Sequence, residues 1–355
     1  MSSRRFVCDF HPQFLHVHFQ VDMGEAYYMD PEVRKQEIRK GQQGLYERYG
    51  HYSAVIPAPV EMPDVIAKIG FQPLDFLNAA LCGKMEFRPD ETVWTPEKPL
   101  QNVETMDDVL ALPEIDWEQN TLYQNFLHQL EVQEVANPNA RSMGMQCVTS
   151  LGNGNAKFVI HTPYTTAFRL MGERIFELML LEEDVANALF DYLYRQYRNQ
   201  AEHFCRRQQW KLTQIHWGDC AATMLSPDLF RQSNLAFATR IMEQEGFLGC
   251  TQHSCGPSTH LLEAFQEIPR LQELQLGFGT DLRKARELFP DTMILAYLHA
   301  AELLNGTPDG IRRQLEQMAE NLQDNFCIMA SAIDAKTPEA NLQAFLEIAQ
   351  AENAG

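Results

Sequence analysis

The pattern of hydrophobic and polar residues changes about one third of the way along the chain. After about residue 106, short apolar runs of strand length alternate with longer stretches that have helical spacing. The strand-like runs cover residues 156–161, 212–217, 247–252, 293–298 and 326–330. Strands that alternate with helices of this length indicate a parallel sheet built from β–α–β crossovers.

Local start and turn signals support this division. Ser226-Pro227-Asp228 and Thr337-Pro338-Glu339 each place a hydroxyl, a proline and an acid in succession, which is typical of a helix N-terminus. The first predicts a helix that runs to about residue 245, and the second opens the last helix. Gly152-Asn153-Gly154 predicts a turn.

Residues 1–105 are less regular than residues 106–355. Residues 14–21 alternate like a strand, residues 30–50 are helical in pattern, and residues 86–105 predict a loop or a β-ribbon. The expected fold is a single α/β domain over 1–355: a distorted (β/α)8 TIM barrel with an irregular N-terminal third. An open doubly wound sheet is the alternative, although neither G-x-G-x-x-G after a strand nor a Walker A loop is present.

Composition restricts the possible partners and the compartment. The 355 residues are 45% hydrophobic and carry a formal net charge of −19, which argues against nonspecific nucleic-acid binding. There is no apolar run of membrane-spanning length and no visible secretory signal. Eight scattered cysteines in such a chain suggest reduced thiols. We therefore expect a cytoplasmic protein that contacts neither nucleic acid nor membrane.

Polar residues capable of chemistry follow several predicted strands. In a parallel barrel the C-terminal ends of the strands meet on one rim, where active sites form. The residues at these ends are His161, Asp219, His253, Cys255, His299 and Ser331.

The triplet His253-Ser254-Cys255 is the most informative of these. Residues i and i+2 of an extended segment point to the same face, so an imidazole and a thiol would aim into the barrel mouth together. Both groups suit zinc. The alternative is a hydrogen-bonded histidine beside an ordinary buried cysteine. Cys250 points to the opposite face and is expected in the core.

Several motifs resemble the uroporphyrinogen decarboxylase superfamily. They are, in chain order, Thr162-Pro163-Tyr164-Thr165-Thr166-Ala167, Gly218-Asp219 with Ser226-Pro227-Asp228-Leu229-Phe230, His253-x-Cys255-Gly256, Asn305-Gly306-Thr307-Pro308 and Thr337-Pro338-Glu339-Ala340-Asn341. The H-x-C-G motif resembles the zinc motif of the corrinoid-dependent branch, the methylcobamide:coenzyme M methyltransferases. The resemblance covers residues 106–350 and implies a distorted TIM barrel.

The resemblance implies a third zinc ligand, a cysteine after the last strand. Here that position is Ser331, a poor ligand. Cys327 lies four residues deeper, roughly 13 Å below the rim at strand spacing. His299 is the better substitute, because it stands at a strand end. The expected metal set is therefore His253, Cys255 and His299, with Asp219 as the catalytic or orienting carboxylate. His161, Tyr164 and Ser331 are expected to contact the substrate.

The implied activity is a zinc-dependent methyl transfer between a corrinoid and a thiol or similar small acceptor. No D-x-H-x-x-G corrinoid pattern occurs, so a partner protein would carry the corrinoid. Similar barrels are commonly homodimers. One alternative is a uroporphyrinogen decarboxylase-like lyase, although residues 1–60 lack the Arg-rich RQAGR segment of those enzymes. Another is a barrel that has lost catalysis and only binds a ligand.

A different family remains to be weighed. His16-x-His18 on a predicted first strand is similar to the start of metal-dependent amidohydrolase barrels. The simpler interpretation is two packed histidines, because no matching lysine or late-strand aspartate follows in the required order. His216 is expected to pack, because it lies on the face opposite Asp219.

Overall fold

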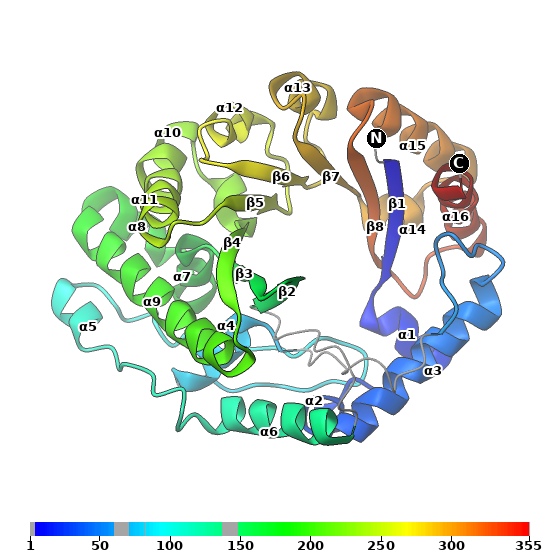
Figure 1. The fold of residues 1–355 in the computed structure, drawn as a ribbon. Helices are drawn as coiled ribbons and strands as arrows, with labels where there is room; N and C mark the ends of the chain where they lie inside the picture. The colour runs from blue at the N-terminus through cyan, green and yellow to red at the C-terminus, as the bar shows by residue number, and fades with distance from the viewer. Residues whose placement is uncertain (1–3, 60–70, 82, 137–147, 355) are drawn as a thin grey trace.

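The computed structural model describes residues 4–59, 71–81, 83–136 and 148–354. In these ranges eight strands form one curved sheet with the order β1-β8-β7-β6-β5-β4-β3-β2 (Figure 1). The strands are β1 Arg4–Phe10, β2 Val148–Gly152, β3 Asn155–His161, β4 Lys211–Gly218, β5 Gly249–Ser254, β6 Leu271–Leu276, β7 Met293–Leu298 and β8 Phe326–Ile333.

The sheet is parallel except at one edge. Every neighbouring pair runs in the same direction apart from β2 and β3, which form an antiparallel hairpin. Its turn is Gly152-Asn153-Gly154, as predicted, and all three residues have positive φ angles. Within the described residues β1 and β2 are the two edges, so strand pairing does not close the barrel. The architecture is a distorted (β/α)8 barrel, as the sequence predicts.

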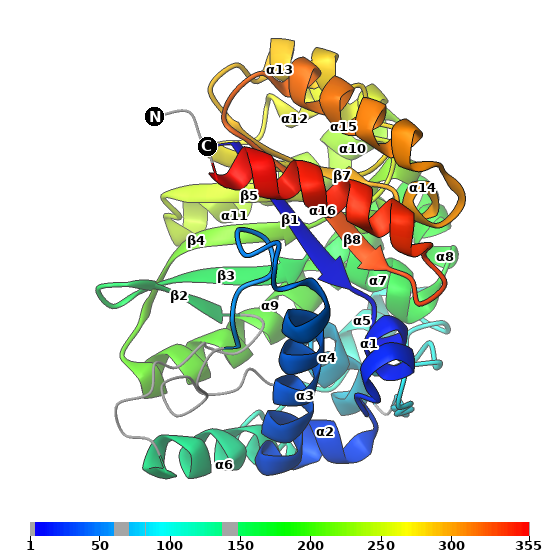
Figure 2. The same ribbon diagram turned by 90° about the vertical axis from the view of Figure 1, so that its right-hand side faces the viewer.

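Helices surround this sheet. Those before β2 are α1 Pro12–Phe19, α2 Glu25–Met29, α3 Pro31–Tyr49, α4 Pro73–Ala80, α5 Met106–Leu110 and α6 Thr121–Ala136. Those between β3 and β5 are α7 Pro163–Met171, α8 Arg174–Leu181, α9 Glu183–Gln208, η2 Cys220–Met224, α10 Pro227–Phe230, η3 Arg231–Leu235 and α11 Ala236–Glu245. The remainder are η4 Thr259–Leu261, α12 Leu262–Phe265, α13 Leu282–Leu288, α14 Ala300–Asn305, α15 Pro308–Leu322 and α16 Glu339–Ala354. Figures 1 and 2 show α9, α15 and α16 outside the arc of strands.

The predicted β–α alternation after residue 106 is confirmed. The five predicted strands correspond to β3, β4, β5, β7 and β8. The helix predicted from Ser226 begins at Pro227 and reaches Glu245, but five residues in its middle form a π-helical turn, η3. The loop expected at residues 86–105 is confirmed, with one isolated bridge between Glu86 and Trp94.

The strand predicted at residues 14–21 is wrong, because Pro12–Phe19 is helix α1. Pro12 occupies the first turn, where its missing N–H costs nothing, and the His11 side chain accepts a hydrogen bond from the Gln13 N–H. His16 and His18 therefore point in different directions around a helix. They bond to separate carbonyls, and the H-x-H metal strand of the amidohydrolase interpretation is absent here.

Alternation along the strands separates an outer face from an inner face. On β3 and β4 the buried residues Phe158 and Trp217 pack against Tyr194 of α9. The residues that alternate with these along each strand, including His161 on β3 and His216 on β4, point to the inner side of the curved sheet. The inner face therefore carries polar groups, while the apolar core lies between the sheet and its helices.

None of the helices in the described ranges combines the length and the apolar character needed to cross a bilayer.

A glycine after β6 leaves room for the loop after β5. A Cβ on Gly277 would lie 2.0 Å from the Cys255 carbonyl oxygen and 2.4 Å from the Gly256 nitrogen. Because backbone cannot yield as a side-chain end can, we expect Gly277→Ala to reduce the free energy of unfolding by about 1–3 kcal/mol. Thermal unfolding measures this.

Gly256→Ala is the matched control for this substitution. Its Cβ would meet only the side-chain end of Thr223, at 3.2 and 3.3 Å, so its cost should be smaller. Equal melting temperatures for the wild type and Gly277→Ala would contradict the close approach.

Candidate metal centre

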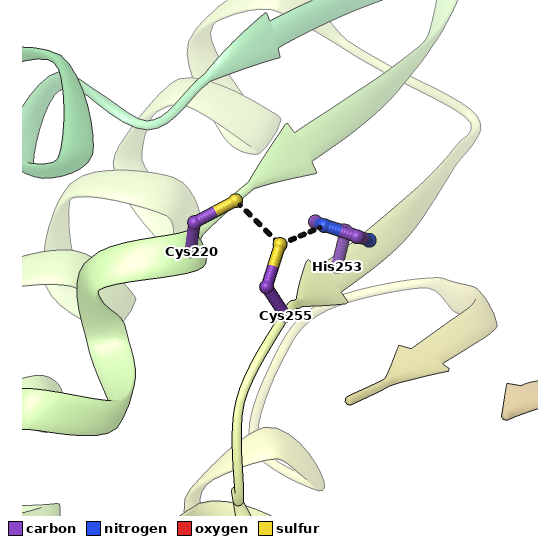
Figure 3. A group of neighbouring side chains, drawn as sticks. All are labelled: Cys220, His253 and Cys255. Carbon is purple, nitrogen blue, oxygen red and sulfur yellow. Dashed lines mark hydrogen bonds between the residues drawn. The ribbon is translucent and has the colours of Figure 1, made fainter. Parts of the chain in front are cut away.

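Three side chains from two neighbouring strand ends converge on the inner face. The Cys220 Sγ lies 3.0 Å from the Cys255 Sγ, which is in turn 2.9 Å from the His253 Nε2 (Figure 3). One donor atom from each residue lies within 4.8 Å of the other two. His253 and Cys255, predicted as a metal pair, are therefore together, and Cys220 joins them.

Strand register produces this convergence. β4 and β5 are parallel neighbours in which Gly218 is opposite His253. Two residues beyond Gly218, Cys220 begins η2, and two residues beyond His253 comes Cys255. The Asp219 N–H donates to the His253 carbonyl at 2.8 Å, so the pairing of the two chain segments continues past Gly218.

Asp219 anchors the segment that carries Cys220. Its carboxylate is 1% exposed and accepts bonds from the hydroxyls of Thr162 and Thr165 on Oδ1, at 2.8 and 3.0 Å. Asn234, in the π-helical turn, donates to Oδ2 at 2.7 Å. Burial raises the pKa of Asp219, and these bonds counteract part of the increase. The carboxylate thus holds its own loop rather than facing the open side of the site.

Tyr164, expected to contact the substrate, lies behind the same loop. Its ring is 1% exposed, and its hydroxyl donates to the Ala221 carbonyl at 3.3 Å. Thr165 accepts from the Ala221 N–H at 3.2 Å. The resemblance motif at 162–167 therefore supports the position of Cys220 through two contacts to the next residue.

Two further imidazoles lie on the inner face near Cys220, His253 and Cys255. Burial, with smaller effects from Arg169 and His253, lowers the pKa of His161 to about 4. Burial also lowers the pKa of His216 to about 3, and its ring centroid is 5.9 Å from that of His253. Both rings are neutral at pH 7. The expectation that His216 merely packs misses this proximity to His253.

His299, the predicted third ligand, lies outside the group found among the described residues. Its Nδ1 accepts from the Ala301 N–H at 3.0 Å and caps α14, while its ring is 3.8 Å from the ring of Phe278. Ser331 lies half-buried in β8, and two strands separate β8 from β5 in the sheet. The last strand is therefore not a neighbour of the strand that carries His253.

The three groups share their protons unequally. The hydrogen bond from Cys220 and, against the opposing effect of burial, the bond from His253 lower the pKa of Cys255 to about 4. The bond to Cys255 and burial raise the pKa of Cys220. Burial lowers the pKa of His253, but the bonds to Cys255 and Gln275, together with the negative charges of Cys255 and Asp219, outweigh burial and the net shift is upward. Cys255 is therefore the thiolate of the metal-free site.

This donor set suits a thiophilic metal ion. Two sulfur atoms and one imidazole nitrogen are ligands that zinc prefers, and three protein ligands leave a fourth tetrahedral position for a substrate. Cys255 is exposed, so the site is accessible from solvent. The signal for Cys220 was present in the sequence, because it directly follows Asp219 at a predicted strand end.

The fold and this site define a (β/α)-barrel protein with a Cys-His-Cys cluster at its rim. A family model described as uroporphyrinogen decarboxylase (URO-D) matches residues 158–351, which contain all three residues. The chain belongs to this family.

Comparison of structures gives a match along the whole chain. A methyltransferase from Methanosarcina mazei superimposes with a TM-score of 0.61 at 15% identity, covering 100% of this chain and 96% of that one. At this identity the likeness concerns the fold. No curated protein matches the sequence.

The lowered pKa of Cys255 predicts unusual reactivity in the metal-free protein. Because the thiolate is lost only as pH falls through about 4, its alkylation by iodoacetamide should stay near its maximal rate at pH 6. Peptide mapping by mass spectrometry gives the rate at this residue. Cys220→Ala removes the hydrogen bond that lowers the pKa of Cys255 most, so it should raise the pH at which the alkylation rate is half-maximal. A wild-type midpoint near pH 8.5, the ordinary cysteine value, would contradict the assignment.

Proposed function

We propose that this protein is a zinc-dependent methyltransferase that moves a methyl group between a corrinoid, carried by a partner protein, and a thiol or similar small acceptor. The observation that carries this proposal is the convergence of Cys220, His253 and Cys255 at the barrel rim. Membership of the URO-D family and the likeness to a methyltransferase fold support it.

The residues present fit a zinc ion. Their donor atoms already lie within 4.8 Å of one another, and they come from two segments fixed by strand pairing and by the Asp219 bonds. Cys220 takes the place that the sequence alone assigns to His299. When bound, zinc supplies Lewis acidity that keeps a sulfur ligand deprotonated and nucleophilic near pH 7.

The transfer balances without a redox partner. The acceptor thiol would give its proton to solvent, and its sulfur would attack the methyl carbon. A carbon–sulfur bond would form as the methyl group leaves the corrinoid, which would keep the electron pair of the broken bond. The product is a thioether. In the reverse direction the same steps would load the corrinoid.

The chain's own residues hold and orient the reactants. Cys220, His253 and Cys255 fix the metal position, and Asp219 keeps the Cys220 loop in place. His161 remains neutral at working pH, so it offers a hydrogen bond to the acceptor without adding positive charge. Ser331 lies on the far strand β8, where a longer substrate would reach it.

Metal content tests the site. Purified wild-type protein loaded with zinc and then desalted should retain about one equivalent, because all three donors are preorganised. Cys220→Ala, Cys255→Ala and His253→Ala should each lose most of it, measured by elemental analysis. Cys8→Ser replaces a half-buried cysteine of β1. It is the matched control and should bind zinc like the wild type. Zinc retention in all three ligand variants would refute the metal set.

Methyl transfer tests the activity. Zinc-loaded protein is incubated without oxygen with methylcobalamin and a panel of small thiols, and loss of methylcobalamin absorbance is followed. We expect thiol-dependent turnover that falls at least 100-fold in Cys255→Ala and is unchanged in Cys8→Ser. A metal-independent conversion of uroporphyrinogen would instead favour the lyase alternative. Inertness in both assays would favour a binding protein.

A further inference from the structure

The Nδ1 nitrogen of His253 is hydrogen-bonded to Gln275, which is hydrogen-bonded in turn to Glu273. Both residues lie on the neighbouring strand β6. His253 Nδ1 lies 2.9 Å from Gln275 Oε1, and Gln275 Nε2 donates to Glu273 Oε1 at 2.6 Å. Register explains the contact, because His253 of β5 is opposite Gln275 of β6. Glu273 and Gln275 are two residues apart and share the inner face.

The Glu273 carboxylate determines which groups donate and which accept in this series of hydrogen bonds. A carboxylate accepts hydrogen bonds, so the NH2 group of Gln275 must face Glu273. The carbonyl oxygen of Gln275 must then face His253, and this oxygen also only accepts. The proton of a neutral His253 ring therefore belongs on Nδ1. The hydroxyl of Tyr297 is 3.5 Å from the same nitrogen, too far to be a strong competitor.

In the metal-free site Nε2 shares a proton with the Cys255 thiolate, and once a metal ion displaces that proton this order leaves the lone pair on Nε2. Nε2 is the atom that faces the Cys255 Sγ at 2.9 Å, in the group of three donors. The other tautomer would direct an N–H at the metal position and would also place two acceptors, Nδ1 and Oε1, against each other. Both costs weaken metal binding.

We propose that Gln275, fixed by Glu273, is the positioning residue that selects the metal-binding tautomer of His253. This inference rests on the metal site of the proposed function and does not depend on the methyl transfer. Glu273 acts one step further away, by preventing the Gln275 amide from rotating. Neither residue belongs to the group of donors itself.

Zinc affinity, measured by competition with a chelator, tests the proposal. Gln275→Leu should bind zinc about 10–100-fold more weakly than wild type. The exchange Glu273→Gln with Gln275→Glu keeps one amide and one carboxylate in the pair, restores an acceptor toward His253 Nδ1 and should recover most of the affinity. Glu273→Gln allows the amide to rotate and should show a smaller loss. Gln214→Leu removes a half-buried glutamine of β4 and is the matched control, with wild-type affinity expected.

A double-mutant cycle separates positioning from general damage. In a His253→Ala background, Gln275→Leu should cause no further loss, because its target is gone. The melting temperature of the metal-free protein should be equal in wild type and Gln275→Leu. A twofold or smaller change in zinc affinity, an equal loss in the His253→Ala background, or failure of the Glu273→Gln and Gln275→Glu exchange to rescue would each overturn the proposal.

The two proposals can fail separately. Wild-type protein that binds zinc but transfers no methyl group would refute the activity and leave the role of Gln275 intact. Methyl transfer by the wild type together with wild-type zinc affinity in Gln275→Leu would refute the role of Gln275 and leave the activity intact.

Discussion

The site depends on one constraint of strand pairing, the parallel register of β4 with β5. Because Gly218 lies opposite His253, the residues that follow each strand leave the sheet at the same level. The Asp219 N–H then bonds to the His253 carbonyl, and Cys220 meets Cys255 at 3.0 Å. A shift of one residue in this register would send the alternating side chains to opposite faces and separate the donors.

The Asp219 carboxylate, which supports this contact, is costly to bury unless its hydrogen bonds are made. Its partners therefore favour one arrangement of the loop. A carboxylate that is 1% exposed needs partners, and the Asp219 carboxylate accepts hydrogen bonds from the N-cap of α7, from α7 itself and from the π-helical turn. The π-helical turn is itself an irregularity, and it contains Asn234, which reaches that carboxylate. These interactions make the loop after β4 a fixed element, which a preorganised metal centre requires.

The sequence predicts the alternating part of the fold well because its signals are local. The apolar runs that become β3, β4, β5, β7 and β8 are short, rich in branched or aromatic residues and bounded by turn or cap residues. β6 lacks this signal, because Leu271–Leu276 reads LQELQL, a composition equally suited to helix. Missing β6 also hid Gln275, the partner of His253.

The group of candidate ligands could be predicted from the sequence only in part, for a similar reason. His253 and Cys255 belong to one segment, so strand periodicity places them together without knowledge of the rest of the fold. The third ligand depends on which strands are neighbours in space. His299 and Cys220 both follow strand ends in the sequence, yet β4 adjoins β5 while β6 stands between β5 and β7. In the N-terminal third, a proline at the helix start overrides the alternation of residues 14–21.

X-ray absorption at the zinc edge tests the central claim most directly, because it counts sulfur atoms around the bound metal. The arrangement of Cys220, His253 and Cys255 predicts two sulfur ligands at about 2.3 Å and one imidazole nitrogen at about 2.0–2.1 Å. Replacing Cys220 by alanine should remove one sulfur from that shell. A wild-type shell with a single sulfur, or with only nitrogen and oxygen, would contradict the account.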